Sequence, residues 1–190
     1  MPFETLDFLV ERSRSGKAVV LAVAAPHGED ILEAVAEARE KGVALPILFG
    51  DRERIEKVAS EFSIDTSSWP VVQEADEGRA AELAVKAVSS GEADLLMKGN
   101  VKTATLLKAV LNKEWGLRSG SLLSHVFLFQ IPRMGRVFCL TDGGMSMYPD
   151  LEAKKAIIEN AVECYHKLGV ECPRVAALAA VETVNQDMPC

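Results

Sequence analysis

Polar and basic residues gather between an apolar run and a helical pattern near the middle of the chain. Leu95–Met97 has the composition of a short strand, Lys98–Lys102 is a charged and flexible turn, and Thr103–Leu111 has apolar residues at helical spacing. A helix that begins after such a turn presents free backbone N–H groups and the positive end of its dipole. We therefore expect Asn100–Thr105 to form an anion-binding corner.

The charge around this corner differs from that of the whole chain. Residues 98–136 hold one acidic residue, Glu114, among many basic ones, whereas the 190-residue chain has a formal net charge of −7. A basic region in an acidic protein favours a small phosphate-bearing ligand, because acidic surface elsewhere would repel a long polyanion such as DNA. A plain solvated basic face is the alternative interpretation. The basic residues are Lys98, Lys102, Lys108, Lys113, Arg118, Arg133 and Arg136.

Other polar residues are weaker candidates for chemistry. Ser124 and His125 are neighbours on a strand-like run, and adjacent side chains of a strand point to opposite faces, so a nucleophile–base pair is poorly placed there. Asp142 precedes two glycines and is either a site carboxylate or a residue that shapes its own turn. His27 and His166 fit a loop residue and a helix-surface residue better than catalysts.

Signatures of several common enzyme classes are absent from the sequence. It contains no G-x-G-x-x-G, G-x-x-x-x-G-K-[ST] or G-x-S-x-G pattern. The four cysteines show no C-x-x-C spacing, so we expect reduced thiols and no metal site. Residues 1–12 are too acidic for a signal peptide, and the apolar run Ala18–Pro26 is too short to cross a bilayer. These features predict a cytoplasmic protein.

The elements that must position the corner alternate regularly along residues 1–120. Unbroken apolar runs indicate strands buried on both faces, and each is followed by a helical pattern, which predicts an α/β fold with a mostly parallel sheet in three αβα layers. Ligands bind such sheets at the carboxyl ends of the strands, where the corner lies. After a helix at 1–16, we expect strands at 18–25, 46–49, 71–72 and 95–97, and helices at 29–41, 51–62, 76–88 and 103–111.

The pattern changes after residue 120, where we place a domain boundary between residues 1–120 and 121–190. Two strand-like runs, 124–131 and 136–141, are joined by a short turn and predict an antiparallel hairpin. A helix at 150–168 and a buried strand at 174–181 follow. We expect this last strand to be solvent-exposed on one side, which favours a homodimer.

Five sequence blocks, in order, resemble the phosphate butyryltransferase and, more distantly, the phosphate acetyltransferase family. The resemblance covers nearly the whole chain, although the first hundred residues match mainly in the order of their elements. Five ordered blocks are far more specific than one glycine motif. They are MKGNVKTATLLKAVL at 97–111, LSH at 123–125, TDGGMSMYPD at 141–150, IIENAV at 157–162, and residues 176–185.

The resemblance implies a fold similar to that of isocitrate and isopropylmalate dehydrogenases, with two α/β domains and a cleft between them. It implies an acyltransferase that exchanges a butyryl or acetyl group between coenzyme A and inorganic phosphate. The expected small-molecule partners are acyl-CoA, phosphate and acyl phosphate. Coenzyme A is then a substrate, and no cofactor, metal or covalent acyl-enzyme is required. No nucleic acid or membrane partner is expected.

The resemblance also assigns roles at the corner. Gly99, Asn100 and Thr103 would contact phosphate through backbone and hydroxyl groups. Lys98 would add positive charge, and Lys108 would take the place of a basic residue one helical turn further in. Fixed donors at such a corner can also stabilise the oxyanion of acyl transfer.

Two further residues are implied on the second domain. Ser124 would face the corner across the cleft as a substrate-binding and catalytic residue, and Asp142 would be a catalytic carboxylate. The plainer alternatives are a polar residue at a strand start for Ser124 and a turn-shaping residue for Asp142.

The sequence also departs from the family pattern. Family members continue past the position of Cys190 through a G-P-L-x-x-D segment that carries an aspartate general base, so we expect the second domain here to be incomplete. Loss of that base would lower the rate by roughly a hundredfold to ten-thousandfold. The alternative function is therefore a catalytically inactive phosphate- or CoA-binding remnant. A metal- and NAD-dependent dehydrogenase on the same fold is disfavoured, because Asp142 and Asp150 alone supply no aspartate cluster.

Overall fold

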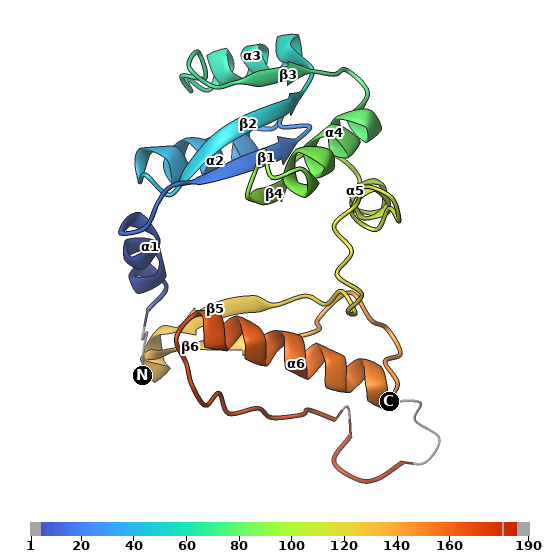
Figure 1. The fold of residues 1–190 in the computed structure, drawn as a ribbon. Helices are drawn as coiled ribbons and strands as arrows, with labels where there is room; N and C mark the ends of the chain where they lie inside the picture. Colours follow the sequence, from blue (N-terminus) through green and yellow to red (C-terminus); the bar gives the residue numbers. More distant parts are fainter. Residues whose placement is uncertain (1–4, 180, 186–190) are drawn as a thin grey trace. The chain divides into compact units, whose positions relative to one another are not determined.

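The computed structural model describes residues 5–179 and 181–185 and divides into two compact units. The N-terminal unit comprises residues 10–119, and the C-terminal unit comprises residues 120–190 together with residues 1–9. Helix α1 (Leu6–Arg14) spans this division, and the backbone N–H of Leu6 donates to Oε1 of Gln130 at 3.2 Å. Figure 1 shows the elements of each unit.

A four-stranded parallel sheet forms the centre of the N-terminal unit, in the order β3-β2-β1-β4. Its strands are β1 (Val19–Ala24), β2 (Ala44–Gly50), β3 (Val71–Gln73) and β4 (Leu95–Lys98). Each of them coincides with a predicted strand to within about two residues. The predicted α/β class with a mostly parallel sheet is thereby confirmed.

Two pairs of helices cover the two faces of this sheet. The apolar side chains of β1 alternate between them: Leu21 and Val23 pack with α2 and α3, whereas Ala22 and Ala24 pack with α4 and α5. Period-two alternation sends successive side chains to opposite faces, so a strand covered on both sides must be apolar throughout. The helices are α2 (Glu29–Glu40), α3 (Arg52–Glu61), α4 (Glu77–Ser89) and α5 (Thr103–Val110).

The beginnings of these helices differ in a way that matters for the site. The Asp51 carboxylate accepts from the backbone N–H groups of Glu53 and Arg54 at 3.0 and 3.4 Å and so caps α3, as predicted. Asp76 caps α4 through the N–H of Arg79 at 2.8 Å. Helices α2 and α5 have no side-chain cap.

The C-terminal unit contains a two-stranded antiparallel sheet and one long helix. Strands β5 (Phe127–Ile131) and β6 (Arg136–Leu140) pair across the 3-10 turn η1 (Pro132–Met134), which confirms the predicted hairpin. Helix α6 (Leu151–Lys167) is capped by Asp150 and buries Ile157 and Ala161. Its bounds agree with the predicted helix at 150–168.

The predicted buried strand at 174–181 is wrong for the part of it that the structure describes. No strand is present in residues 171–179 or 181–185, and Leu178 and Val184 are 86% and 97% exposed. A buried strand needs a neighbouring strand to satisfy its backbone and a layer to cover its side chains. The described part of the chain supplies neither, so the apolar pattern alone does not produce a strand.

In residues 5–179 and 181–185, no helix is both long enough and apolar enough to span a bilayer.

Candidate anion-binding site

Strands β1 and β4 are parallel neighbours in the sheet, but the helices that follow them lie on opposite faces of the sheet. β1 continues into α2 on one face, whereas β4 continues into α5 on the other face. In an open parallel sheet, this is the switch point at which the loops diverge and ligands bind. The loops concerned are residues 25–28 after β1 and residues 99–102 after β4.

These two loops are pinned to each other by their backbones. The N–H of Gly99 donates to the carbonyl oxygen of Ala24 at 2.9 Å, and the N–H of Asn100 donates to that of Ala25 at 2.8 Å. A Cβ atom at Gly99 would lie 2.5 Å from both carbonyl oxygens, so only glycine fits. Ala25 itself has φ of +53°, a strained conformation for a residue with a side chain.

This pinning changes which donors the corner offers. The N–H groups of Gly99 and Asn100 are engaged with β1, so the predicted backbone contacts from these two residues are not available to a ligand. The N–H of Thr105 donates to the backbone carbonyl oxygen of Lys102 at 3.0 Å. Within the described residues, the N–H groups of residues 101–104 have no acceptor. The free donors therefore begin at Val101.

Helix α5 also differs from the other described α-helices in its first turn. Each of the others has an acidic residue there, which offsets the helix dipole, whereas α5 has none and lacks a side-chain cap. Uncapped amides with no acidic residue in their own helical turn favour an anion from outside the helix. The N-cap position of α5 is Lys102, whose side chain has no hydrogen-bond acceptor, so the local sequence supplies no cap there.

The predicted side chains lie in different positions around the corner. Asn100 and Thr103 are exposed at the start of α5, and the Asn100 side chain lies so close to Gly28 that a Cβ there would be 2.9 Å away. The Lys98 Nζ donates to the carbonyl oxygen of Gly99 at 3.1 Å. Lys108 lies in the last turn of α5, more than one turn from Thr103. Asn100 and Thr103 therefore lie together at the start of α5, whereas Lys108 lies further along the helix.

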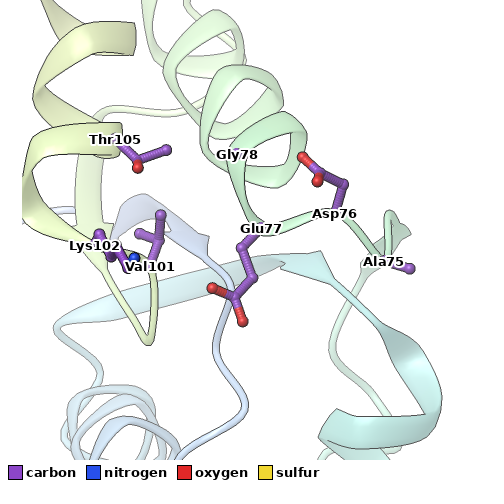
Figure 2. Close-up of a pocket in the computed structure, with 7 residues that line it drawn as sticks. All are labelled: Ala75, Asp76, Glu77, Gly78, Val101, Lys102 and Thr105. Carbon is purple, nitrogen blue, oxygen red and sulfur yellow. The ribbon is translucent and has the colours of Figure 1, made fainter.

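An open depression of about 480 Å³ adjoins the corner, between the first turns of α4 and α5 (Figure 2). One side is formed by Val101, Lys102 and Thr105, and the other by residues 75–78. Residues 75–78 were not predicted from the sequence as part of a site. The available signal was positional: they follow the carboxyl end of β3, the same edge of the sheet as the corner.

A group of ionisable side chains meets at Glu77, which lines one side of this depression. Oε1 of Glu77 is 3.4 Å from Nη1 of Arg54 and 3.4 Å from Nε2 of His27. The His27 side chain is only 9% exposed. Burial and the neighbouring Arg54 lower the pKa of His27, and the carboxylates of Glu77 and Asp51 oppose this shift. His27 is a loop residue, as predicted, but its side chain also approaches the Glu77 carboxylate.

In the C-terminal unit, Ser124 is held by a residue from α6. Nδ2 of Asn160 donates to Oγ of Ser124 and to the carbonyl oxygen of Leu122, both at 2.8 Å. His125 makes a different contact, stacking on Phe127 with ring centroids 6.2 Å apart. The two neighbours therefore form no dyad, as predicted. Asn160 was not predicted as a functional residue, although an amide within the largely apolar stretch IIENAV is a signal for a specific bond.

Asp142 organises the loop that follows β6. Its carboxylate accepts from the backbone N–H groups of His125, Met145 and Ser146 at 3.2, 3.3 and 3.0 Å. Burial alone would raise the pKa of Asp142, but these hydrogen bonds together with one from the Ser146 hydroxyl outweigh it and lower the pKa. Of the two roles considered for Asp142, the structure shows the turn-shaping one.

The same loop bounds a small apolar pocket of about 290 Å³. Two glycines, Gly143 and Gly144, leave space on one side of it, because a Cβ on Gly144 would meet nothing within 4 Å. The remaining lining residues are His125, Phe127, Leu140 and Met145.

The described part of the chain holds cysteine thiols but no cluster of metal-binding side chains. Its residues contain no group of three or more His, Cys, Asp or Glu side chains positioned to hold a metal ion. Cys139, Cys164 and Cys172 are free thiols, and Cys190 lies outside the described residues.

The chain is similar in sequence to members of one known family. Residues 70–190 match the family described as phosphate acetyl/butaryl transferase. The chain is 42% identical to a phosphate butyryltransferase from Clostridium beijerinckii, over 97% of this chain and 61% of the relative. It is 40% identical to a phosphate acetyltransferase from Thermotoga maritima, over 97% of this chain and 62% of the relative. The chain thus spans about 60% of the length of these relatives.

A solved structure is similar as well. The crystal structure of a branched-chain phosphotransacylase from Enterococcus faecalis V583 superimposes with a TM-score of 0.73 and is 34% identical, over 90% of this chain and 59% of that one. A phosphotransacetylase from Streptococcus pyogenes, at 16% identity and a TM-score of 0.72 over 88% of this chain and 60% of that one, shares the fold. From the family match and these similarities, the chain belongs to the phosphate acetyl/butaryl transferase family.

Proposed function

We propose that this chain takes part in the transfer of a butyryl or acetyl group between coenzyme A and inorganic phosphate. One observation carries the proposal: α5 begins at the sheet's switch point with backbone N–H groups that no described residue engages, no cap and no acidic residue in its first turn. Such a start suits a phosphate group. The family membership narrows the ligand to the phosphates of the acyl-transfer substrates.

In the proposed reaction, an oxygen of phosphate attacks the acyl carbon of the thioester. A C–O bond forms while the carbonyl electrons move onto oxygen, and the oxyanion then collapses, breaking the C–S bond. Coenzyme A leaves as a thiolate and takes up the proton that the phosphate group gives up. The N–H groups of residues 101–104 and the hydroxyl of Thr103 would hold phosphate, and Lys102 would offset its charge.

The role of Ser124 in this reaction is part of the proposal. Its hydroxyl accepts a hydrogen bond from Asn160, which leaves its own proton free to be donated. A donated O–H bond to the developing oxyanion would stabilise acyl transfer.

Assembly and location also belong to the proposal. The apolar side chains exposed beyond α6, including Leu178 and Val184, support a homodimer, because large apolar side chains in water favour a protein partner. The free thiols of the described cysteines are consistent with a cytoplasmic protein. Coenzyme A serves as a substrate, and no cofactor is proposed.

Binding and turnover are tested separately. We expect coenzyme A and butyryl phosphate to raise the melting temperature, and phosphate to release free thiol from butyryl-CoA. The thiol assay is run on the chain alone and on a fusion with the part of the C. beijerinckii relative that follows the matched region. Binding without turnover in both proteins would support the non-catalytic alternative. Absence of any thermal shift would refute the phosphate site.

A further inference from the structure

The depression beside the proposed phosphate site carries carboxylates as well as a cation. Its lining includes Asp76 and Glu77 on one side and Lys102 on the other. A bare carboxylate here would repel a phosphate group. The Asp76 carboxylate caps α4 through the N–H of Arg79, and the positive end of the helix dipole partly offsets its charge there. Glu77 is the carboxylate whose charge must be offset if an anion is to bind.

Glu77 meets two basic side chains that do not line the depression. Nη1 of Arg54, from the first turn of α3, and Nε2 of His27, from the loop after β1, both approach its Oε1 at 3.4 Å. Side chains from the loop after β1 and from the first turn of α3 therefore meet the Glu77 carboxylate in the first turn of α4. Arg54 is charged at every physiological pH, so it supplies a permanent compensating charge.

We propose that Arg54 is a positioning residue for anion binding: by pairing with Glu77, it converts a depression that would repel phosphate groups into one that accepts the phosphates of coenzyme A or of an acyl phosphate. This inference rests on the proposed function and identifies the residue that sets the charge of the same site. His27 supports Glu77 from the buried side, and Arg54 acts from the exposed side.

The expected size of the effect follows from exposure. The side chains of Arg54 and Glu77 are 50% and 40% exposed, so solvent weakens their interaction. We expect a change in ligand affinity of about three- to tenfold at low ionic strength. It should shrink as salt is added, because the Debye length falls to about 8 Å at physiological ionic strength.

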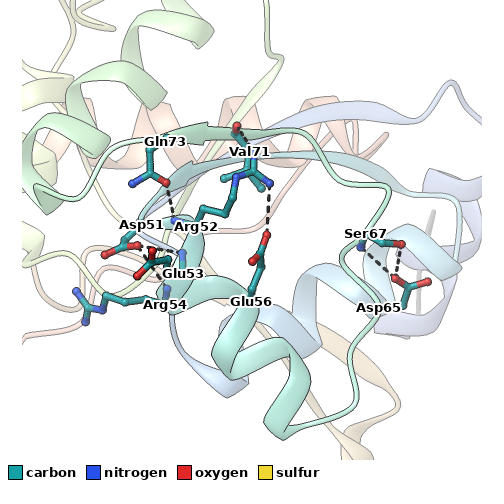
Figure 3. A network of polar contacts seen from close by, with 9 residues as sticks. All are labelled: Asp51, Arg52, Glu53, Arg54, Glu56, Asp65, Ser67, Val71 and Gln73. Atoms are coloured by element: carbon teal, nitrogen blue, oxygen red, sulfur yellow. Dashed lines mark hydrogen bonds and ion pairs between the residues drawn. The ribbon is translucent and has the colours of Figure 1, made fainter.

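The chain provides a matched control in the same helical turn. Arg52 lies two positions before Arg54, but Nη1 of Arg52 pairs with Glu56 at 3.5 Å and Nη2 donates to the carbonyl oxygen of Val71 at 3.2 Å. Figure 3 shows these contacts together with the Asp51 cap. Replacing Arg52 therefore removes the same charge from the same helix without exposing Glu77.

The test is titration calorimetry with coenzyme A and with pyrophosphate on Arg54→Gln, Glu77→Gln, the double variant and Arg52→Gln. Arg54→Gln should lower the affinity for both ligands about three- to tenfold, whereas Glu77→Gln should raise it. The double variant should return close to wild type, and Arg52→Gln should change affinity less than twofold. A purely structural pair would instead weaken binding in both single variants.

The outcomes separate this inference from the proposed function. Wild-type protein that binds neither ligand overturns both. Wild-type protein that binds, with Arg54→Gln indistinguishable from Arg52→Gln or with Glu77→Gln weakened, overturns only the role of Arg54. If Arg54→Gln does not fold, Arg54→Lys should keep the affinity, and Glu77→Gln alone still decides the sign of the effect.

Discussion

A Cβ atom on Gly99 would lie 2.5 Å from the carbonyl oxygen of Ala25, well inside van der Waals contact. This close approach sets the beginning of α5 against the end of β1 through backbone atoms alone. Because Ala25 already has positive φ, neither side of the contact can relax easily. The position of the free N–H groups at residues 101–104 therefore depends on a single glycine.

Gly99→Ala should destabilise the protein by about 2 to 3 kcal/mol, because the added methyl group must displace two backbone carbonyls. The melting temperature should fall by about 5 to 10 °C. Gly16→Ala is the control, since its nearest neighbour would be the Ser13 carbonyl oxygen at 3.5 Å, an ordinary contact. Equal stability of the two variants in thermal unfolding would contradict this packing.

Thr103→Val should weaken the binding of coenzyme A and pyrophosphate about tenfold, because it removes a hydroxyl group that would donate a hydrogen bond to a charged phosphate. The melting temperature should stay within about 2 °C, since the Thr103 hydroxyl bonds to no described residue. Thr66→Val, in the loop before β3 at the opposite end of the strands, should leave binding unchanged. Titration calorimetry measures both. An unchanged affinity in Thr103→Val would remove this residue from the site.

Asp142→Asn should lower stability by about 1 kcal/mol at pH 7, because an amide is a weaker acceptor for three backbone N–H groups than a carboxylate. The folded-state pKa of Asp142 is lowered, so its contribution is present above the unfolded pKa of about 4 and is lost as pH falls through the folded value. Urea unfolding at pH 7 and pH 3 should therefore show a difference between wild type and variant that shrinks in acid. Glu171→Gln, an exposed change in the same unit, should show little difference at either pH.

Asn160→Ala should lower the free energy of unfolding by about 1 to 2 kcal/mol, because it removes the donor of two hydrogen bonds that hold residues 122–124. Urea unfolding measures this change.

Ser124→Ala should lower the free energy of unfolding by less than Asn160→Ala does, since Asn160 keeps its bond to Leu122. If Ser124 serves the proposed reaction, Ser124→Ala should still lower thiol release from butyryl-CoA at least about tenfold. The control is Ser121→Ala in the same exposed segment. Wild-type turnover in Ser124→Ala would rule out a catalytic part for its hydroxyl.

Local features of the chain were predictable because the interactions that produce them are local. The unbroken apolar run of β1 requires cover on both faces, and this requirement is present in the composition of the run itself. The Asp51 cap depends on atoms two and three residues away. The start of α5 after a flexible basic turn was likewise visible in the spacing of residues 98–111.

The sequence by itself determined the kinds and order of the helices and strands up to α6 and the start of α5 after a basic turn, because each of these depends on neighbours within a few residues. Only the tertiary structure decided that β4 pairs with β1 and that the N–H groups of Gly99 and Asn100 donate to carbonyl oxygens at the end of β1. It also decided that Arg54 and His27 contact Glu77. It also decided that residues 174–179 form no strand. These outcomes depend on which distant segments become neighbours, and a local pattern of apolar and polar residues does not specify its partner.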